Sequence, residues 1–116
     1  MSQNDIPDFN ETEIGIVRQT LGERYNGDIE LELADVELRL DQGSTVRTPC
    51  PTLVWRLRGA DFVITKVGAD RFPAQFFYRG YQQYGTGKSE FDNIGACAVT
   101  LLQVQADHEA RQNKKK

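Results

Sequence analysis

The spacing of apolar residues changes twice along this chain, and this change restricts the possible folds more than any other feature. Apolar residues recur at helical spacing from Ile14, at every second position from Ile29, and at helical spacing again from Ile94. A period of 3.6 residues is typical of an amphipathic helix, and a period of two is typical of a half-buried strand. The order of helix, strands and helix predicts an α+β fold.

The first helix has a clear start signal. Asn10 is placed as the N-cap with Glu13 three residues later, which is the pattern of a capping box, and Phe9 and Ile14 occupy the positions of a hydrophobic staple. The helical spacing continues through Val17, Leu21 and Tyr25. We expect the helix to end at 26–27, an Asn-Gly pair suited to the left-handed conformation that closes helices.

The segment after this helix alternates apolar and acidic residues. Its apolar positions are Ile29, Leu31 and Leu33, followed at the opposite parity by Val36, Leu38 and Leu40. A change of parity within a strand moves the apolar side chains to the other face of the sheet unless one residue is left unpaired. We therefore expect one long strand with a bulge at 34–35.

Two further strands and a hairpin are predicted in the middle of the chain. Residues 42–51 are expected to form a loop, 52–58 a strand, 59–61 a three-residue connection and 62–67 a second strand. The predicted pairs are Leu57 with Val63 and Leu53 with Val67. With this register Val54, Phe62 and Ile64 point away from the helices, so something must cover the second face of the sheet, and a second copy of the chain is one candidate.

The last third of the chain contains the strongest helical pattern. A turn at 68–70 leads to an aromatic strand at 75–81 and a polar loop at 82–88. One helical stripe then contains Ile94, Cys97, Leu101, Val104 and His108, flanked by Ala98 and Leu102.

We expect a curved antiparallel sheet of about four strands with both helices on one face. This single domain spans 10–112, between a flexible leader at 1–9 and a basic tail at 113–116.

Composition excludes several classes of protein. The chain has 116 residues, 27% of them charged, a net charge of −3 and a pI near 5.1, which gives no general attraction to nucleic acid or anionic membranes. No stretch approaches the roughly 18 consecutive apolar residues of a membrane span. The N-terminus is polar and acidic, unlike a signal peptide. We expect a cytoplasmic protein whose two cysteines, Cys50 and Cys97, are free thiols.

The segment 85–89, Gly-Thr-Gly-Lys-Ser, ends like a phosphate-binding loop. In such loops backbone N–H groups surround phosphates while the lysine adds charge and the serine holds magnesium. The motif requires glycine five positions before Gly87, where this chain has Gln82. We therefore interpret the segment as a loop without a nucleotide.

Thiol and metal chemistry have few candidates. Cys50 lies between Pro49 and Pro51, and a reactive thiolate there would need a base or cation such as Arg47 or the single histidine, His108. Metal binding by Cys97 and His108 is excluded, because eleven helical residues separate them by roughly 16 Å. We expect no metal and no cofactor, and an enzyme using Cys50 is the third of three functional hypotheses.

Charge is segregated along the chain. Seven acids and two bases occur between positions 23 and 41, whereas seven bases and two acids occur between 47 and 88. Two interpretations stay open. The carboxylates of Glu30, Glu32 and Glu37 can pair with Arg56 and Arg58 across neighbouring strands, or the basic residues can form a surface together with nearby aromatic rings.

The second interpretation leads to the functional hypothesis. Tryptophan, tyrosine and arginine anchor many protein interfaces. The candidate partner-binding residues are Trp55, Arg56, Arg58, Phe77, Arg79, Tyr81 and Tyr84. We expect a small non-enzymatic binding protein (an accessory protein, adaptor or assembly factor) that recognises another protein through this sheet face. The alternative is binding of single-stranded nucleic acid, in which such rings would stack on bases.

Overall fold

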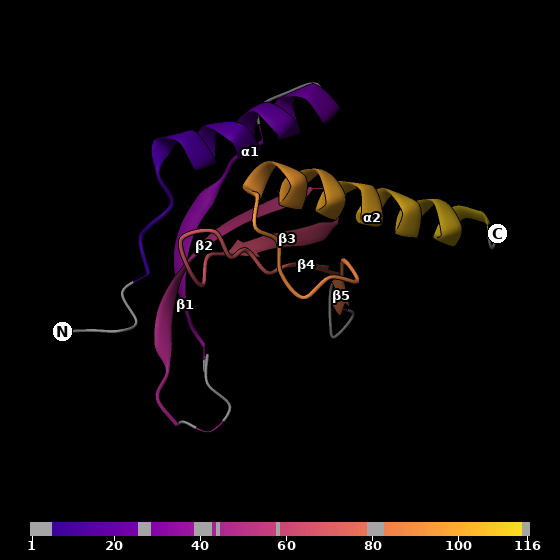
Figure 1. The fold of residues 1–116 in the computed structure, drawn as a ribbon. Coiled ribbons are helices and arrows are strands. Elements are labelled where there is room, and N and C mark those ends of the chain that lie inside the picture. The colour runs from indigo at the N-terminus through magenta and orange to yellow at the C-terminus, as the bar shows by residue number, and fades with distance from the viewer. Residues whose placement is uncertain are drawn as a thin grey trace.

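The computed structural model describes residues 6–25, 29–38, 43, 45–57, 59–78 and 83–114. A helix is followed by five strands and a second helix (Figure 1). The elements are α1 (Glu11–Arg24), β1 (Glu32–Leu38), β2 (Thr48–Leu57), β3 (Ala60–Thr65), β4 (Ala74–Phe77), β5 (Gln83–Gly85) and α2 (Ile94–Lys114). The strands form one antiparallel sheet in the order β1-β2-β3-β4-β5. The predicted α+β class is confirmed, with five strands in place of about four.

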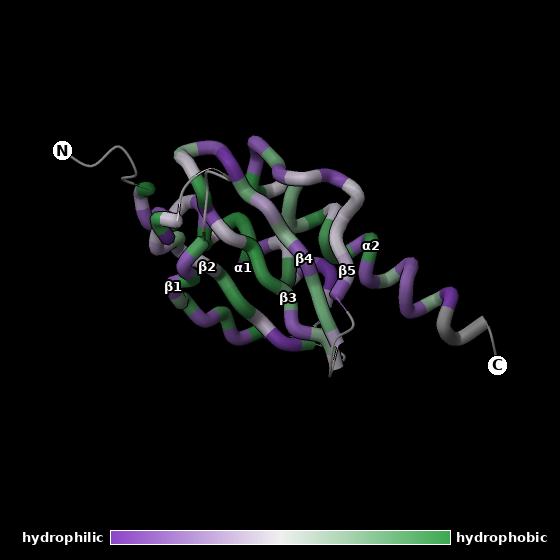
Figure 2. Tube along the Cα trace, turned by 90° about the horizontal axis from the view of Figure 1, so that it is seen from below, coloured by the Kyte–Doolittle hydropathy of each residue, from purple (hydrophilic) through white to green (hydrophobic). Residues whose placement is uncertain are grey.

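Both helices lie on the same side of the sheet, as predicted (Figure 1). The core between the layers contains Val17, Leu21, Leu53, Trp55, Phe62, Ile64, Phe76, Leu101 and Leu102, all at most 1% exposed. Burial of each such side chain contributes about 1.5–3 kcal/mol before the entropy of ordering is subtracted. Figure 2 turns the opposite face of the sheet toward the viewer, and neither α1 nor α2 covers that face. We call it the open face.

The capping box at the start of α1 is confirmed. The Glu13 N–H donates to the Asn10 side-chain oxygen at 2.7 Å, and the Asn10 N–H donates to the Glu13 carboxylate at 2.9 Å. These two bonds satisfy donors that the first turn of a helix cannot pair internally. The helix ends at Arg24, with Tyr25 as its C-cap. The predicted stop at 26–27 lies outside the described residues.

The helical stripe predicted for α2 is also confirmed. Ile94, Cys97, Ala98, Leu101 and Leu102 are buried, while Val104 and His108 are half-buried. Asn93 caps the helix, because its side chain accepts a hydrogen bond from the Ala96 N–H at 2.9 Å.

The predicted register of the central hairpin is wrong by three residues. Leu57 pairs with Ala60 and Leu53 with Ile64, through a two-residue connection in which Gly59 has a φ of +80°. Positive φ is typical of such short hairpin turns. Because side chains alternate along a strand, an odd shift reverses the face of every residue of β3 relative to β2. Ile64 therefore lies in the core, and so does Phe62, contrary to the prediction.

The strand β2 begins at Thr48, inside the segment that the sequence indicated as a loop. Pro49 and Pro51 are the reason for that error, since proline cannot donate to a strand ladder. The Lys66 N–H donates to the Pro51 carbonyl at 2.9 Å, so the backbone of Pro51 faces β3 and not β1. The residue opposite Pro51 lies just beyond the last residue of β3, Thr65. The missing donor of Pro51 therefore costs little here.

No bulge interrupts β1 within the described residues, contrary to the prediction. Its pairing with β2 is regular from Glu32 opposite Val54 to Leu38 opposite Thr48. The change of parity instead places Val36 and Leu38 on the open face. The apolar residues of β1 thus lie on both faces of the sheet.

The end of the sheet differs from the prediction as well. The strand expected at 75–81 is β4, which ends at Phe77, and β5 lies in the segment predicted as a polar loop. Phe76 is opposite Tyr84, and their ring centroids are 5.4 Å apart. A single aromatic residue among polar neighbours gives no period-two signal, so the sequence could not reveal this strand.

The predicted leader is not free at its end. Phe9 is 7% exposed and stacks on Phe72 with 6.3 Å between ring centroids. Beside these rings, the ammonium of Lys66 donates to both carboxylate oxygens of Glu13, at 2.8 and 3.0 Å, and to the Asp8 carbonyl at 3.1 Å. This buried ion pair attaches the start of α1 to the sheet.

Candidate partner-binding surface

Strand alternation separates the four predicted binding residues that the structure describes. Asp61 of β3 pairs with Arg56 of β2 and with Phe77 of β4. The side chains of Arg56 and Phe77 therefore both lie on the open face. Trp55 and Tyr84 lie on the helix side. The other three, Arg58, Arg79 and Tyr81, lie outside the described residues.

Trp55 is a core residue, and its assignment to an exposed surface is wrong. Its side chain is 1% exposed and stacks on Phe62, with 5.3 Å between centroids and 4° between ring planes. Neighbouring residues in a strand point to opposite faces, so Trp55 and Arg56 could not both lie on one surface. The indole N–H has no hydrogen-bond partner within the described part of the chain.

Tyr84 belongs to an aromatic cluster between the sheet and α2. Its ring lies 4.2 Å from that of His108, and both contact Phe76 and Tyr78. The Gln105 amide, 1% exposed, donates to the Tyr78 hydroxyl at 3.1 Å. These contacts anchor α2 over β4 and β5, and they give Tyr84 and His108 structural roles.

The open face holds an apolar groove that the sequence did not predict. It has a volume of about 430 Å³ and lies between the end of β1 and β4. Its walls are formed by Val36, Leu38, Val63, Thr65, Pro73, Ala74, Gln75, Phe77 and Ser89. Val36 is 38% exposed, and Leu38, Val63 and Phe77 are half-buried. The parity change in β1 indicates that Val36 and Leu38 lie on the open face, but the sequence analysis attributed this change to a bulge.

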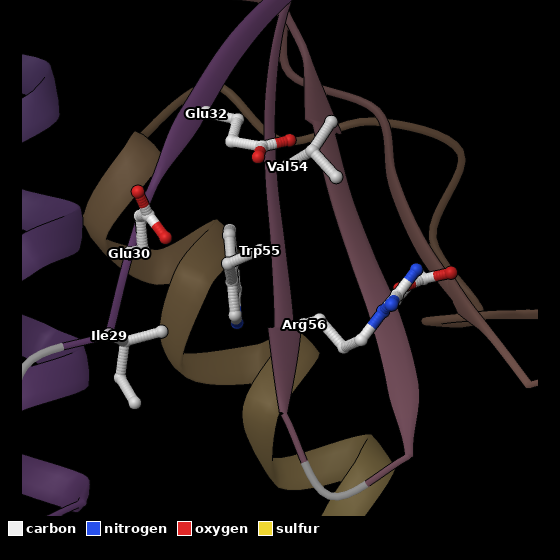
Figure 3. A pocket seen from close by; sticks show the side chains of 7 residues that line it. Ile29, Glu30, Glu32, Val54, Trp55 and Arg56 are labelled. Atoms are coloured by element: carbon white, nitrogen blue, oxygen red, sulfur yellow. The ribbon is translucent and has the colours of Figure 1, made fainter.

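A second recess lies where β1 diverges from β2 (Figure 3). It has a volume of about 310 Å³ and is lined by Ile29, Glu30, Glu32, Val54, Trp55, Arg56 and Asp61. The Arg56 guanidinium donates to Asp61 at 2.7 Å, and this bond and charge raise the pKa of Arg56 above its ordinary value. Arg56 is therefore paired along the β2–β3 hairpin, and Glu32 contributes only a weaker attraction.

Both cysteines are buried free thiols, as predicted for their redox state. Cys50 is 0% exposed within β2, and its thiol donates weakly to the Thr48 carbonyl at 3.4 Å. Burial, and secondarily the charge of Asp35, raises the pKa of Cys50. Burial raises the pKa of Cys97 to about 12. The extended loop that was expected to display Cys50 is a buried strand instead.

The segment 85–89 does not have the arrangement of a phosphate-binding loop. Gly85 ends β5, and α2 begins only at Ile94. The Lys88 ammonium lies 4.8 Å from the centre of the Phe91 ring, and the Lys88 N–H donates to the Thr86 hydroxyl. A phosphate loop would lead directly into the helix, so that its N–H groups converge on the anion.

The described residues contain no group of three or more histidine, cysteine or acidic side chains that could hold a metal ion. They also contain no helix long and apolar enough to cross a membrane.

Comparison of the chain with protein-family models, with curated proteins and with solved structures found no match.

Proposed function

We propose that this chain is a non-enzymatic, cytoplasmic binding protein that recognises another protein through the open face of its sheet. The observation that carries the proposal is the apolar groove formed by Val36, Leu38, Val63 and Phe77, on the face that neither helix covers. Sheets with one apolar face are stabilised when that face is covered, and grooves of this kind often receive a partner.

The chemistry of the groove supports a protein partner. Its centre is aliphatic and aromatic, while Thr65, Gln75 and Ser89 supply hydrogen-bonding groups among its walls. An apolar centre with polar groups around it is the usual composition of protein interfaces. Phe77 is the one aromatic residue predicted from the sequence that the described structure keeps in the proposed surface, and Arg56 lies on the same face.

Single-stranded nucleic acid remains the alternative, but the groove does not favour it. Among the described residues that line the groove there is no lysine or arginine. Phosphate contacts supply most of the affinity in nucleic-acid binding. The hypothesis of an enzyme using Cys50 loses support from the raised pKa of that thiol, because the thiolate is the nucleophile.

The experiment compares two valine-to-lysine variants. Val36 lies in the groove and is 38% exposed, whereas Val99 lies on α2 and is 51% exposed. Tagged wild type, Val36→Lys and Val99→Lys are used to capture proteins from lysate of the source cells, with and without nuclease treatment, and quantitative mass spectrometry is the readout. Both variants change charge and size equally, and circular dichroism checks that both fold.

We expect at least one protein that wild type and Val99→Lys capture equally and Val36→Lys loses by about tenfold or more, because a lysine in an apolar interface centre is unpaired. Capture that is insensitive to Val36→Lys would contradict the proposal. Loss of all bound material on nuclease treatment would favour the nucleic-acid alternative. Light scattering identifies the remaining outcome, a homodimer that Val36→Lys dissociates.

A further inference from the structure

The first observation concerns the backbone of β1, which is an edge of the sheet. Pro51 faces β3, because its carbonyl accepts the Lys66 N–H. In antiparallel strands the N–H and C=O of one residue point to the same side, and successive residues alternate. Cys50 and Thr52 therefore face β1, where they pair with Val36 and Ala34.

It follows that the intervening residues of β1 direct their backbone groups outward. These residues are Leu33, Asp35 and Glu37, and they present three N–H and three C=O groups at the sheet edge. No other strand pairs with them within the described part of the chain. An edge of this kind is a template for one more strand.

The second observation is that a recess lies beside this edge on each face of the sheet, an apolar one on the open face and a mixed one on the helix side. On the open face, Val36 and Leu38 form one wall of the groove described above. On the helix side, a recess of about 280 Å³ is lined by Asp8, Phe9, Leu33, Ala34, Asp35 and Pro51. Leu33 is 65% exposed, the largest exposure among the apolar side chains identified as exposed. An added strand would direct alternate side chains toward both recesses.

The third observation is charge. Glu30, Glu32, Asp35 and Glu37 are all exposed, and no lysine, arginine or histidine lies among residues 29–38. None of these four carboxylates has an ion-pair partner in the described ranges of the chain. Opposite charges on neighbouring strands attract, whereas like charges directly opposite each other repel.

We infer that β1 binds an extended, basic segment of a partner protein, which adds as a sixth strand. The segment would carry lysine or arginine opposite Asp35 and Glu37, which share one face of β1, and small apolar side chains opposite Val36 and Leu38 on the other face. This inference rests on the proposed function, since it specifies the chemistry and the backbone mode by which the protein partner docks. A second copy of the chain fits less well, because pairing two β1 strands brings two acidic clusters together.

The binding experiment uses a defined probe, a nine-residue peptide in which lysine or arginine alternates with valine or threonine. The readout is hydrogen exchange of backbone amides by NMR in the full chain. In the free protein we expect fast exchange at Leu33, Asp35 and Glu37 and slow exchange at Ala34 and Val36. Saturating peptide is expected to slow the first three amides by about tenfold or more, since each then donates a hydrogen bond.

Two control peptides separate strand addition from nonspecific attraction. One has glutamate in place of every basic residue, and the other is the basic peptide with N-methyl groups on the amides of its basic residues, whose N–H groups would face β1. We expect neither to protect the β1 edge. Equal protection by the N-methylated peptide, or no protection by the unmodified basic peptide at millimolar concentration, would overturn the inference.

Variants at Asp35 test the same edge in the protein. Asp35→Pro removes an outward N–H, and proline is tolerated at such positions of edge strands. Asp35→Asn removes the charge but keeps the N–H. We expect peptide affinity to fall by about tenfold or more in Asp35→Pro and about threefold in Asp35→Asn. Equal affinity in all three proteins would also overturn the inference, and the peptide controls decide it if Asp35→Pro does not fold.

Failure of this inference is distinguishable from failure of the proposed function. A partner that Val36→Lys loses and Asp35→Pro retains, together with unprotected β1 amides, would refute strand addition and leave the open face as the binding surface. A self-association that depends on Asp35 would identify a second copy as the occupant and refute the basic segment.

Discussion

The buried ion pair between Lys66 and Glu13 gives the most specific stability prediction. The Lys66 side chain is 3% exposed and that of Glu13 is 13% exposed, and the ammonium makes two hydrogen bonds to the carboxylate. In Glu13→Gln the ammonium keeps the Asp8 carbonyl but loses its counter-charge. The amide oxygen can still accept the Asn10 N–H, so the capping box is retained.

Removing one partner of a buried ion pair costs about 3–5 kcal/mol, because an uncompensated charge stays in the interior. Water reaches Glu13 to some extent, so we expect the lower end for Glu13→Gln, about 3 kcal/mol. In a domain of this size that corresponds to a fall in Tm of about 10 °C or more. Lys66→Met keeps the volume between Phe9 and Phe72 but leaves the Glu13 carboxylate without its counter-charge. That carboxylate is 13% exposed and still accepts the Asn10 N–H, so the expected cost is about 2 kcal/mol.

Urea unfolding followed by circular dichroism measures the free energies of unfolding of the two single variants and the double variant. In the Lys66→Met background, Glu13→Gln should cost less than about 1 kcal/mol, which gives a coupling energy of about 2 kcal/mol. Glu11→Gln is the matched control, because Glu11 is an exposed acid of the same helical turn. Additive effects, or a loss in Glu13→Gln no greater than in Glu11→Gln, would refute this reasoning.

Three further predictions concern thiols, pH and backbone strain. In the folded protein at about pH 8, neither thiol should react with Ellman's reagent, since burial raises both pKa values, that of Cys97 to about 12; rapid labelling of the native state would show the prediction to be wrong. The Arg71 guanidinium lowers the pKa of Glu90. The pair therefore stabilises the folded state at pH values above the ordinary carboxyl pKa, and this stabilisation is lost as the pH falls through the lowered pKa. The stability difference between wild type and Glu90→Gln should be about 0.2–1 kcal/mol near neutrality, because the pair is exposed, and should close in acid. Gly59→Ala should destabilise the fold by about 1–2 kcal/mol, because φ at this residue is +80°. Gly15→Ala should stabilise it by about 0.5–1 kcal/mol, because alanine has the higher helix propensity and its Cβ meets no neighbour. Thermal unfolding shows whether Tm falls in the first variant and rises in the second.

The helices could be predicted from sequence because their signals are local. The capping box needs only Asn10 and Glu13, and the α2 stripe repeats over more than four turns. Both patterns can therefore be recognised without knowing how the rest of the chain folds. Register is a different problem. An apolar pattern of period two fits a partner strand at several offsets, and only the two-residue turn at Gly59 selects Leu53 opposite Ile64.

The surface could be predicted only in part, because exposure depends on the register and on the layers above it. Arg56 and Phe77 lie on the open face, but their position there follows from pairing with Asp61 that the sequence did not reveal. The aromatic character of Trp55 suggested an interface, although large rings pack equally well in a core. Val36 has no functional role in the interpretation of the sequence, because the predicted bulge at 34–35 would return its side chain to the helix side.

Hydrogen–deuterium exchange of a captured complex tests most directly whether the open face binds the partner. Compared with the free chain, peptides from β1, β3 and β4 should gain protection, while the outer side of α2 around Val99 should exchange unchanged. Protection confined to the helices, with exchange around Val36, Val63 and Phe77 unaltered, would contradict the proposed binding surface.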